Sequence, residues 1–185
     1  VTVKLTELED INVKLRSLSE RDTLTGLDNR RGLEDKARSL LLRPVDVNQP
    51  AVVVLLDIDH FKTLNDEHGH QVGDQVLIEF SERLRVFCRS HDLVGRWGGE
   101  EFILILEGLG REASRTRVQE LHVLIGSRPF YCESEGSEVL YVDVTATLGV
   151  AYYRPDDTFE SAIGRADRAL YRGKEQGRNQ VVWID

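Results

Sequence analysis

The run "AVVVLLDID", from Ala51 to Asp59, constrains the fold of this chain more than any other stretch. It is short, rich in valine and apolar without interruption until its acidic end. Such a run is typical of a strand buried on both faces, because a strand with one wet face would alternate apolar and polar residues. We therefore expect a central strand that is covered on both sides and that ends in carboxylates.

Length and charge limit the classes of function. At 185 residues the chain is long enough for one domain with a full core, and a second core is not expected. The net charge of −8 argues against a nucleic-acid polymer as a partner, because phosphate backbones are bound mostly through Lys and Arg. A small phosphate ligand needs only a few local cations, so a nucleotide partner stays open.

The sequence also indicates a compartment. No apolar run approaches the ~20 residues that cross a bilayer, and the N-terminus lacks the layout of a signal peptide. Cys88 and Cys132 belong to no CxxC pair or Cys/His cluster, so we predict neither a zinc site nor a disulfide framework. A cytoplasmic location fits best. The chain begins at Val1 and contains no methionine, so we interpret it as a piece of a longer protein, which is either free or membrane-tethered.

Apolar residues near the N-terminus recur at coiled-coil spacing. Four of them are separated by 3, 4 and 3 positions, namely Leu8, Ile11, Leu15 and Leu18. Two interpretations stay open: this helix packs on its own domain, or it is the end of a long dimeric helix that leaves an upstream sensor domain. We assign residues 1–20 to this helix and residues 21–185 to the body of the chain.

The rest of the chain mixes helix and strand signals. Helices are expected at about residues 30–42, 73–89, 111–125 and 159–176. Besides the central strand we expect two hairpins and a last strand "QVVWI"; the first hairpin turns at Gly98 and Gly99, and the second joins "PFYC" to "EVLYVDVTATLGVAYY". Glycines at a two-residue turn suit positive φ. Five or six strands with four helices predict an α+β fold with a mixed, largely antiparallel central sheet flanked by helices.

Two acidic groups end apolar strands. Asp57 and Asp59 follow the central strand, and Glu100 and Glu101 lie at the first hairpin. Each group also has a simpler interpretation: the aspartates cap a helix that follows the strand, and the glutamates face solvent beside a turn. If the strands are neighbours, the carboxylates converge and repel one another unless a divalent cation lies between them. Hard oxygen ligands suit Mg²⁺ or Mn²⁺, and such sites serve phosphoryl and nucleotidyl transfer. Because adjacent strand residues point to opposite faces, Glu100 and Glu101 should have different tasks.

Polar residues follow the central strand at irregular spacing: Lys62, Asn65, His70 and Asp74. An Asn amide and an Asp carboxylate together complement the donors and the acceptor on the edge of guanine. Asp74 is alternatively the N-cap of the helix that follows. The sequence thus leaves a guanine site as one of two interpretations.

Small residues and cations complete the set. Gly98 and Gly99 have no Cβ, so a bulky ligand has room against the backbone there. Lys174 and Arg178 are four positions apart at the end of the last helix. They either complement the helix dipole or bind the phosphates of a nucleotide.

Four blocks of this sequence, in order, resemble the GGDEF family of diguanylate cyclases. They are "DTLTGLDNRR" from Asp22, "DIDHFKTLNDEHGHQVGDQVL" from Asp57, "GGEEF" from Gly98 and "RADRALYRGKEQGRN" from Arg165. The resemblance covers about Asp22 to Trp183, and it makes residues 21–185 a GGDEF catalytic domain. It implies a fold similar to nucleotidyl cyclases and polymerase palms, and the condensation of two GTP into cyclic di-GMP with release of two pyrophosphates.

The resemblance also implies a metal site and a homodimer. Each subunit would hold one GTP, and the 3′-hydroxyl of each would attack the α-phosphate of the other. Asp57, the backbone carbonyl of Ile58, and Glu100 resemble the ligands of Mg²⁺ or Mn²⁺, and Glu101 is a further candidate ligand. Glu100 would also activate the 3′-hydroxyl. Lys62 would be a second catalytic residue, a cation at the phosphates.

Further positions follow from the same resemblance. Several positions would contact the substrate. They are Asn65 and Asp74 for guanine, His70 for another substrate contact, Gly98 and Gly99 for the floor of the site, and Lys62, Lys174 and Arg178 for the phosphates. The stretch "RSHD" matches the start of the family's product-inhibition site, with Arg89 and Asp92, although an Arg-x-x-Asp also arises as a surface ion pair. Two other hypotheses remain: a non-catalytic module that senses GTP or cyclic di-GMP, and a cyclase for another nucleotide.

Overall fold

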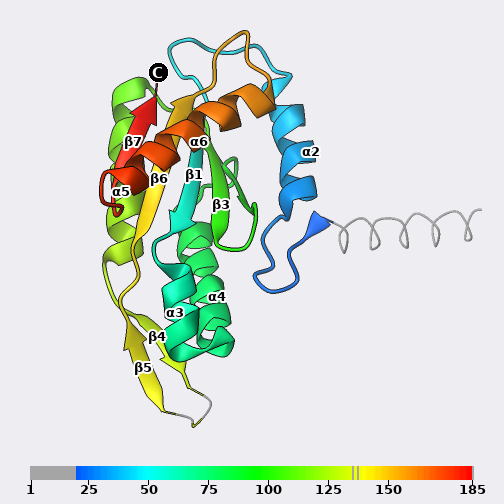
Figure 1. Ribbon diagram of the computed structural model, residues 1–185. Helices are drawn as coiled ribbons and strands as arrows, with labels where there is room; N and C mark the ends of the chain where they lie inside the picture. The colour runs from blue at the N-terminus through cyan, green and yellow to red at the C-terminus, as the bar shows by residue number, and fades with distance from the viewer. Residues whose placement is uncertain (1–19, 135, 137, 185) are drawn as a thin grey trace, which may run out of the picture.

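The valine-rich run is the central strand of a five-stranded sheet in the computed structural model, which describes residues 20–184 except 135 and 137 (Figure 1). All seven residues of this strand are buried. The strands are β1 (Val52–Ile58), β2 (Leu93–Arg96), β3 (Glu101–Leu106), β6 (Ala146–Tyr152) and β7 (Val181–Ile184). Their order is β2-β3-β1-β6-β7, and only the β6–β7 pair is parallel. The predicted mixed, largely antiparallel sheet is confirmed, while the predicted helix over residues 1–20 lies almost entirely outside the described residues.

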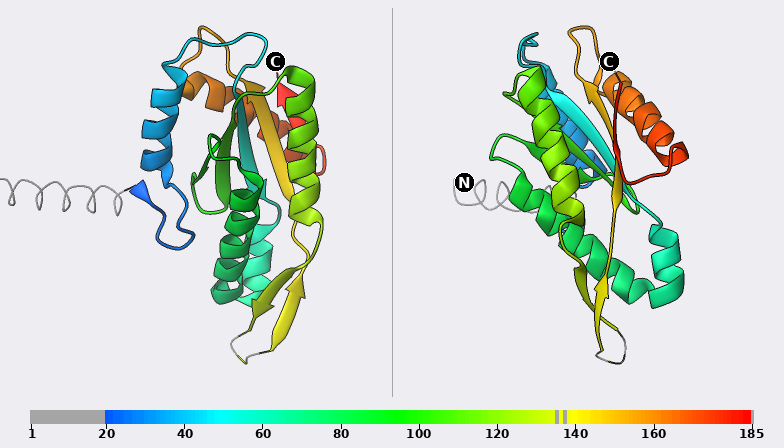
Figure 2. Two further views of the ribbon diagram at one scale, coloured as in Figure 1. Left: turned by 180° about the vertical axis from the view of Figure 1, so that it is seen from behind. Right: turned by 90° about the vertical axis from the view of Figure 1, so that its left-hand side faces the viewer.

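Helices cover both faces of the sheet (Figure 2). One face carries α2 (Arg30–Leu41) and α6 (Phe159–Glu175), and the other carries α3 (Phe61–His68), α4 (His70–Phe87) and α5 (Arg111–Gly126). The side chains of β1 alternate between the two cores, with Val53 and Leu55 facing α2 and α6. This double burial explains why the strand reads as an unbroken apolar run. None of the helices in the described ranges is long and apolar enough to cross a membrane.

Two helix ends have clear local causes. The side chain of Asn29 accepts a hydrogen bond from the backbone N–H of Gly32 and caps α2. At the other end of the chain, Gly177 follows α6 with φ 112°, a left-handed value that favours glycine after a helix. The predicted bounds of α2, α5 and α6 therefore agree with the structure to within one residue.

The segment after β1 differs from its predicted form. The sequence predicted no helix between the central strand and residue 73, but α3 occupies residues 61–68, and α4 begins at His70 rather than at Gly73. The chain turns into α3 at His60, with φ 56°, and out of it at Gly69, with φ 87°. Since α3 is only two turns long, it offers just two buried apolar side chains, Phe61 and Leu64, and no helical periodicity is visible in so short a pattern.

The second hairpin is also different. Its long apolar segment is two strands, β5 (Val139–Val142) and β6, separated by residues 143–145. β5 pairs with β4 (Phe130–Glu133) in a separate two-stranded sheet, seen at the bottom of Figure 1, while β6 joins the central sheet. The burial of β5 is partial and alternating, whereas β6 is buried throughout. The two halves therefore have different surroundings, and the single predicted strand was wrong.

Candidate functional site

The two acidic groups meet at one end of the central sheet. In the β1–β3 pair Asp57 lies directly opposite Glu101, and the backbone N–H of Ile58 donates to the carbonyl of Glu100 at 3.2 Å. Asp57 is only 7% exposed. The prediction that the two strands are neighbours is confirmed. Their pairing brings three carboxylates and the backbone of Ile58 to the same end of the sheet.

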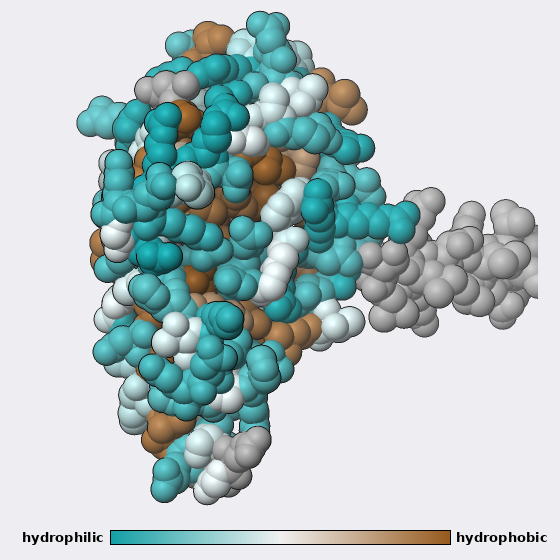
Figure 3. Space-filling model, viewed as in Figure 1, coloured by the Kyte–Doolittle hydropathy of each residue, from teal (hydrophilic) through white to brown (hydrophobic). Residues whose placement is uncertain are grey.

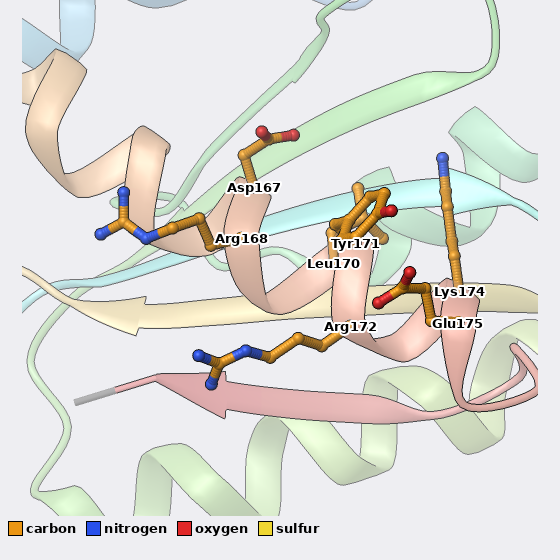
Figure 4. A pocket seen from close by; sticks show the side chains of 7 residues that line it. All are labelled: Asp167, Arg168, Leu170, Tyr171, Arg172, Lys174 and Glu175. Carbon is orange, nitrogen blue, oxygen red and sulfur yellow. The ribbon is translucent and has the colours of Figure 1, made fainter.

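A cation from α6 lies on this acidic end. The Nζ of Lys174 donates to Oδ2 of Asp57 at 2.7 Å. Figure 4 shows Lys174 extending from α6 toward β1, whereas Arg172 of the same turn points away along β7. The side chain was predicted to meet phosphates, and in the structure it neutralises one of the predicted metal ligands.

Close packing of α6 on the sheet makes that contact possible. A Cβ at Gly149 of β6 would lie 2.1 Å from the backbone oxygen of Ala166 and 2.3 Å from the backbone nitrogen of Leu170, both on α6. Only glycine allows the helix backbone to approach the strand so closely. On its outer side α6 lines a shallow pocket of about 410 Å³ that includes Asp167 and Lys174 (Figure 4).

The acidic end carries an excess of negative charge. Burial raises the pKa of Asp57, and the nearby Glu100 and Asp59 add to that rise, while the hydrogen bond from Lys174 opposes it. Burial likewise raises the pKa of Glu101, and the negative charge of Asp57 raises it further. Like charges directly opposite each other on paired strands are destabilising. A second cation placed here would therefore be stabilised by the charges already present.

The donor set fits a hard divalent cation. Within the described residues no group of three His, Cys, Asp or Glu side chains is arranged to hold a metal by itself. A complete protein cage is not required, because Mg²⁺ is usually held by one or two carboxylates and takes its other ligands from phosphates and water. The carboxylates of Asp57 and Glu100 and the carbonyl of Ile58 are oxygen donors of that kind. These residues would hold the ion, with Glu101 on the α6 side.

The glycine turn is built differently from the predicted one. Residues 97–100 separate β2 from β3, and the backbone N–H groups of Trp97 and Gly98 both donate to the carbonyl of Glu101, at 2.7 and 3.3 Å. Neither Gly98 nor Gly99 has the positive φ that the sequence predicted. Both are exposed, and a Cβ at Gly99 would meet nothing within 4 Å. The space above Gly99 is therefore open, and a left-handed turn is not the reason for glycine at either position.

Two residues that sequence reasoning had not assigned support this turn. The guanidinium of Arg96 donates to the carbonyl of Gly99 at 2.7 and 3.0 Å and to both carboxylate oxygens of Asp22 at 3.2 Å. Although burial raises the pKa of Asp22, hydrogen bonds from Thr25 and the charge of Arg96 outweigh it and hold the pKa below its ordinary value. Asp22 begins the block "DTLTGLDNRR" quoted above, and Arg96 lies two positions before "GGEEF"; these positions were the available signal.

The predicted guanine positions converge across α3 and α4. Asn65 lies against Gly73, where an added Cβ would come 1.8 Å from Oδ1 of Asn65. That oxygen is buried and has no hydrogen-bond partner among the described residues. Asp74 is exposed in the second turn of α4, so its alternative role as a helix N-cap is wrong. The structure thus packs Asn65 against α4 one position before Asp74, and it leaves the buried amide oxygen without a partner among the described residues.

The remaining predicted substrate residues are exposed side chains around this end of the sheet. Lys62 lies in the first turn of α3, and His70 begins α4. Arg178 lies three residues beyond the end of α6, as the predicted helix end near residue 176 implied, and it has φ 65°. Its backbone N–H donates to the carbonyl of Gly173 at 2.9 Å, which closes the end of α6.

Arg89 and Asp92 lie away from this end. They precede β2, which pairs Leu93 with Ile105 near the far end of β3. The carboxylate of Asp92 is buried and accepts the backbone N–H of Arg89 at 2.9 Å and the guanidinium of Arg117 at 3.4 Å. Asp92 thus anchors the turn, the exposed Arg89 side chain is available to solvent, and Arg117 is a neighbour that the sequence did not indicate.

A hollow of about 300 Å³ adjoins the acidic end on the α2 and α6 face. Its walls include Trp97, which packs edge-on against Phe159 and lies under the guanidinium of Arg30 at 4.4 Å. Glu101 also borders it. Figure 3 shows hydrophobic residues gathered in the middle of this otherwise hydrophilic face.

Comparison with known proteins gives one consistent result. The family model described as "Diguanylate cyclase, GGDEF domain" matches residues 19–180. The diguanylate cyclase DgcZ of Escherichia coli is 36% identical over 179 residues, which are 96% of this chain and 58% of DgcZ. The response regulator PleD of Caulobacter vibrioides is 38% identical over 166 residues, which are 89% of this chain and 36% of PleD. The chain therefore spans well under two thirds of these relatives.

Solved structures agree. The coiled coil and GGDEF domain of DgcB from Caulobacter crescentus, in complex with c-di-GMP, has a TM-score of 0.86 at 28% identity and covers 99% of this chain and 95% of its own. The diguanylate cyclase SiaD of Pseudomonas aeruginosa, in complex with its activator SiaC, has a TM-score of 0.81 at 35% identity, covering 99% of this chain and 68% of SiaD.

Proposed function

The chain belongs to the GGDEF family of diguanylate cyclases, and we propose that it is an active catalytic domain that condenses two GTP into cyclic di-GMP and two pyrophosphates. The observation that carries the proposal is the meeting of Asp57, Glu100 and Lys174 at one end of the sheet, beside the open turn at Gly99. The signature "GGEEF" keeps both glycines and both acidic side chains of the family signature.

Each half of the reaction is a nucleotidyl transfer. The 3′-oxygen of one GTP attacks the α-phosphorus of the other, the bond from that phosphorus to the bridging oxygen breaks, and pyrophosphate leaves. Glu100 takes the proton of the 3′-hydroxyl. Lys62, Lys174 and Arg178 place positive charge where the leaving phosphates gain negative charge. Two such transfers close the ring and balance two GTP against one cyclic di-GMP and two pyrophosphates.

The proposed activity also implies a divalent cation and a second copy of the chain. A bound Mg²⁺ or Mn²⁺ would neutralise charge on the α-phosphate and the leaving group. Asp57, Ile58 and Glu100 would hold it, with Glu101 as a further ligand. Because one chain offers one set of these residues, two chains must face each other for reaction, and the partner is a second copy of this chain. The upstream sensor domain of the full-length protein would control that pairing.

GTP turnover tests the proposal. The purified protein is incubated with GTP and Mg²⁺, and nucleotides are separated by chromatography. Cyclic di-GMP should form without other additions, and the rate per chain should rise with protein concentration as dimers form. Absence of product at high concentration, and also when the chain is fused to a dimeric coiled coil, would reject the proposed activity.

Asn65→Ala should reduce the preference for GTP over ATP by about tenfold, because a hydrogen-bond acceptor for the guanine edge is lost. The measurement is kcat/KM for each nucleotide. Asp66→Ala, the next position on the same helix, is the control and is exposed. An unchanged preference in the Asn65 variant would remove that residue from base recognition.

We also propose that cyclic di-GMP inhibits the enzyme at Arg89, with Asp92 holding the turn that presents it. Arg89→Ala should raise the cyclic di-GMP concentration for half-inhibition about tenfold or more, because Arg stacks on guanine and pairs with phosphate. The measurement is a product-inhibition curve, with the neighbouring Ser90→Ala as control. Identical curves for wild type and the Arg89 variant would contradict this site.

A further inference from the structure

Asp59 is only two positions from Asp57, but its carboxylate is hydrogen-bonded to Thr145, Thr147 and the backbone of Asn179. It is 7% exposed, and its Oδ1 accepts the hydroxyl of Thr147 at 2.6 Å. Its Oδ2 accepts the hydroxyl of Thr145 at 2.8 Å and the backbone N–H of Asn179 at 3.0 Å. Three donors therefore occupy this carboxylate, and its partners lie on the start of β6 and on the segment after α6.

That segment has an unusual backbone. Three successive residues have positive φ: Gly177 at 112°, Arg178 at 65° and Asn179 at 46°. Left-handed conformations are unfavourable for non-glycine residues, and they persist where surrounding contacts enforce them. Two non-glycine residues in a row are thus held in a conformation that they would not adopt alone.

The enforcing contacts are specific. The N–H of Asn179 is shared between Asp59 and the hydroxyl of Thr147, at 3.0 and 3.1 Å, and its side-chain oxygen contacts Nε2 of His122 at 3.0 Å. A further hydrogen bond, from the N–H of Arg178 to the carbonyl of Gly173, ties the segment to α6. Asp59 is the charged member of this set, and hydrogen bonds to charged groups are about twice as strong as neutral ones.

We propose that Asp59 is a positioning residue that holds residues 177–179 in the left-handed conformation, so that Arg178 is presented to the substrate phosphates at the end of the sheet. It does not touch the substrate; it acts through Arg178. The proposal rests on the proposed function, in which Arg178 meets the phosphates. It predicts that Asp59 affects phosphate binding while leaving guanine recognition at Asn65 intact.

The test compares Asp59→Asn, Arg178→Ala and the double variant, with Asp143→Asn as the control. Asp143 is an exposed aspartate near the same strand break, so it matches the loss of one negative charge. Affinity is measured for GTP and for guanosine, which lacks phosphates. Asp59→Asn should weaken GTP binding about tenfold and guanosine binding less than twofold. In the Arg178→Ala background, Asp59→Asn should add less than twofold, since coupled residues are non-additive.

A second measurement does not depend on nucleotide. In the protein without ligand, the amide hydrogen of Asn179 should exchange at least tenfold faster in Asp59→Asn than in wild type. If Asp59→Asn does not fold, Thr147→Val removes the shared hydroxyl and should give the same pattern to a smaller degree. Equal losses for GTP and guanosine, full additivity with Arg178→Ala, or unchanged amide exchange would each overturn the proposal. Failure of the wild-type protein to bind or turn over GTP would instead reject the proposed function, and the exchange result would still decide the role of Asp59 in the turn.

Discussion

Glu100→Gln is expected to lower the rate of cyclic di-GMP formation by about 10²–10³-fold, the usual loss when one group that stabilises the transition state is removed. Glutamine keeps the size of the side chain, and the backbone carbonyl of residue 100 still accepts the N–H of Ile58. The change therefore removes charge and proton acceptance without disturbing the pairing of β1 with β3. Rates are measured at saturating GTP and Mg²⁺.

The control for this prediction is Glu112→Gln, an identical chemical change at an exposed position in the first turn of α5. It should turn over GTP at the wild-type rate. Binding of GTP by the Glu100 variant should remain measurable, because the proposed guanine contacts, Asn65 and Asp74, are on α3 and α4. A Glu100 variant that forms product within threefold of the wild-type rate would remove this residue from proton transfer and metal binding.

Lys174→Ala is expected to lower kcat/KM for GTP by about 10²-fold, because a cation that meets developing negative charge is lost. It should also change the titration of Asp57. Burial already raises that pKa, and Lys174 opposes the rise, so removing Lys174 raises the pKa of Asp57 further. Since the carboxylate must be deprotonated to bind a cation, the acidic limb of activity should move to higher pH.

The two parts of this prediction are measured separately. The pH dependence of kcat/KM reports the activity, and carboxyl NMR titration of the metal-free protein reports the pKa of Asp57. Arg172→Ala is the control, because Arg172 lies in the same turn of α6 but points away from β1 (Figure 4). A Lys174 variant with an unchanged Asp57 titration would contradict the 2.7 Å contact as a feature in solution.

Elements with long, regular patterns were predictable from sequence. The unbroken apolar run gave β1, and helical periodicity gave α2, α5 and α6 because each has several buried side chains on one face. The two-turn helix α3 was missed since Phe61 and Leu64 alone do not define a period. The division between β5 and β6 was missed because both halves are rich in β-forming residues, and only their different burial separates them.

The residues of the candidate site were likewise only partly predictable from the sequence. The residue types pointed to carboxylate oxygen ligands at Asp57 and at Glu100 or Glu101, and the family resemblance singled out Asp57 and Glu100. The structure brings the backbones of the two strand ends together. The structure also assigned roles that no local pattern carries. Asp59 looked equivalent to Asp57 in the sequence, yet it faces Thr145 and Thr147 rather than the acidic cluster. Arg96 supports the glycine turn by donating to the carbonyl of Gly99, and it also contacts Asp22, 74 positions away.

The sequence by itself determined which segments are buried, where strands end in acid, and which polar and cationic side chains follow those strand ends. These properties depend on neighbours along the chain, and burial imposes a periodicity that the residues display directly. Only the tertiary structure decided that Asp57 is opposite Glu101 and that Lys174 meets Asp57 across 117 positions of sequence. That contact requires α6 to lie against the backbone of Gly149, and such a distance is set by packing between layers rather than by any local preference.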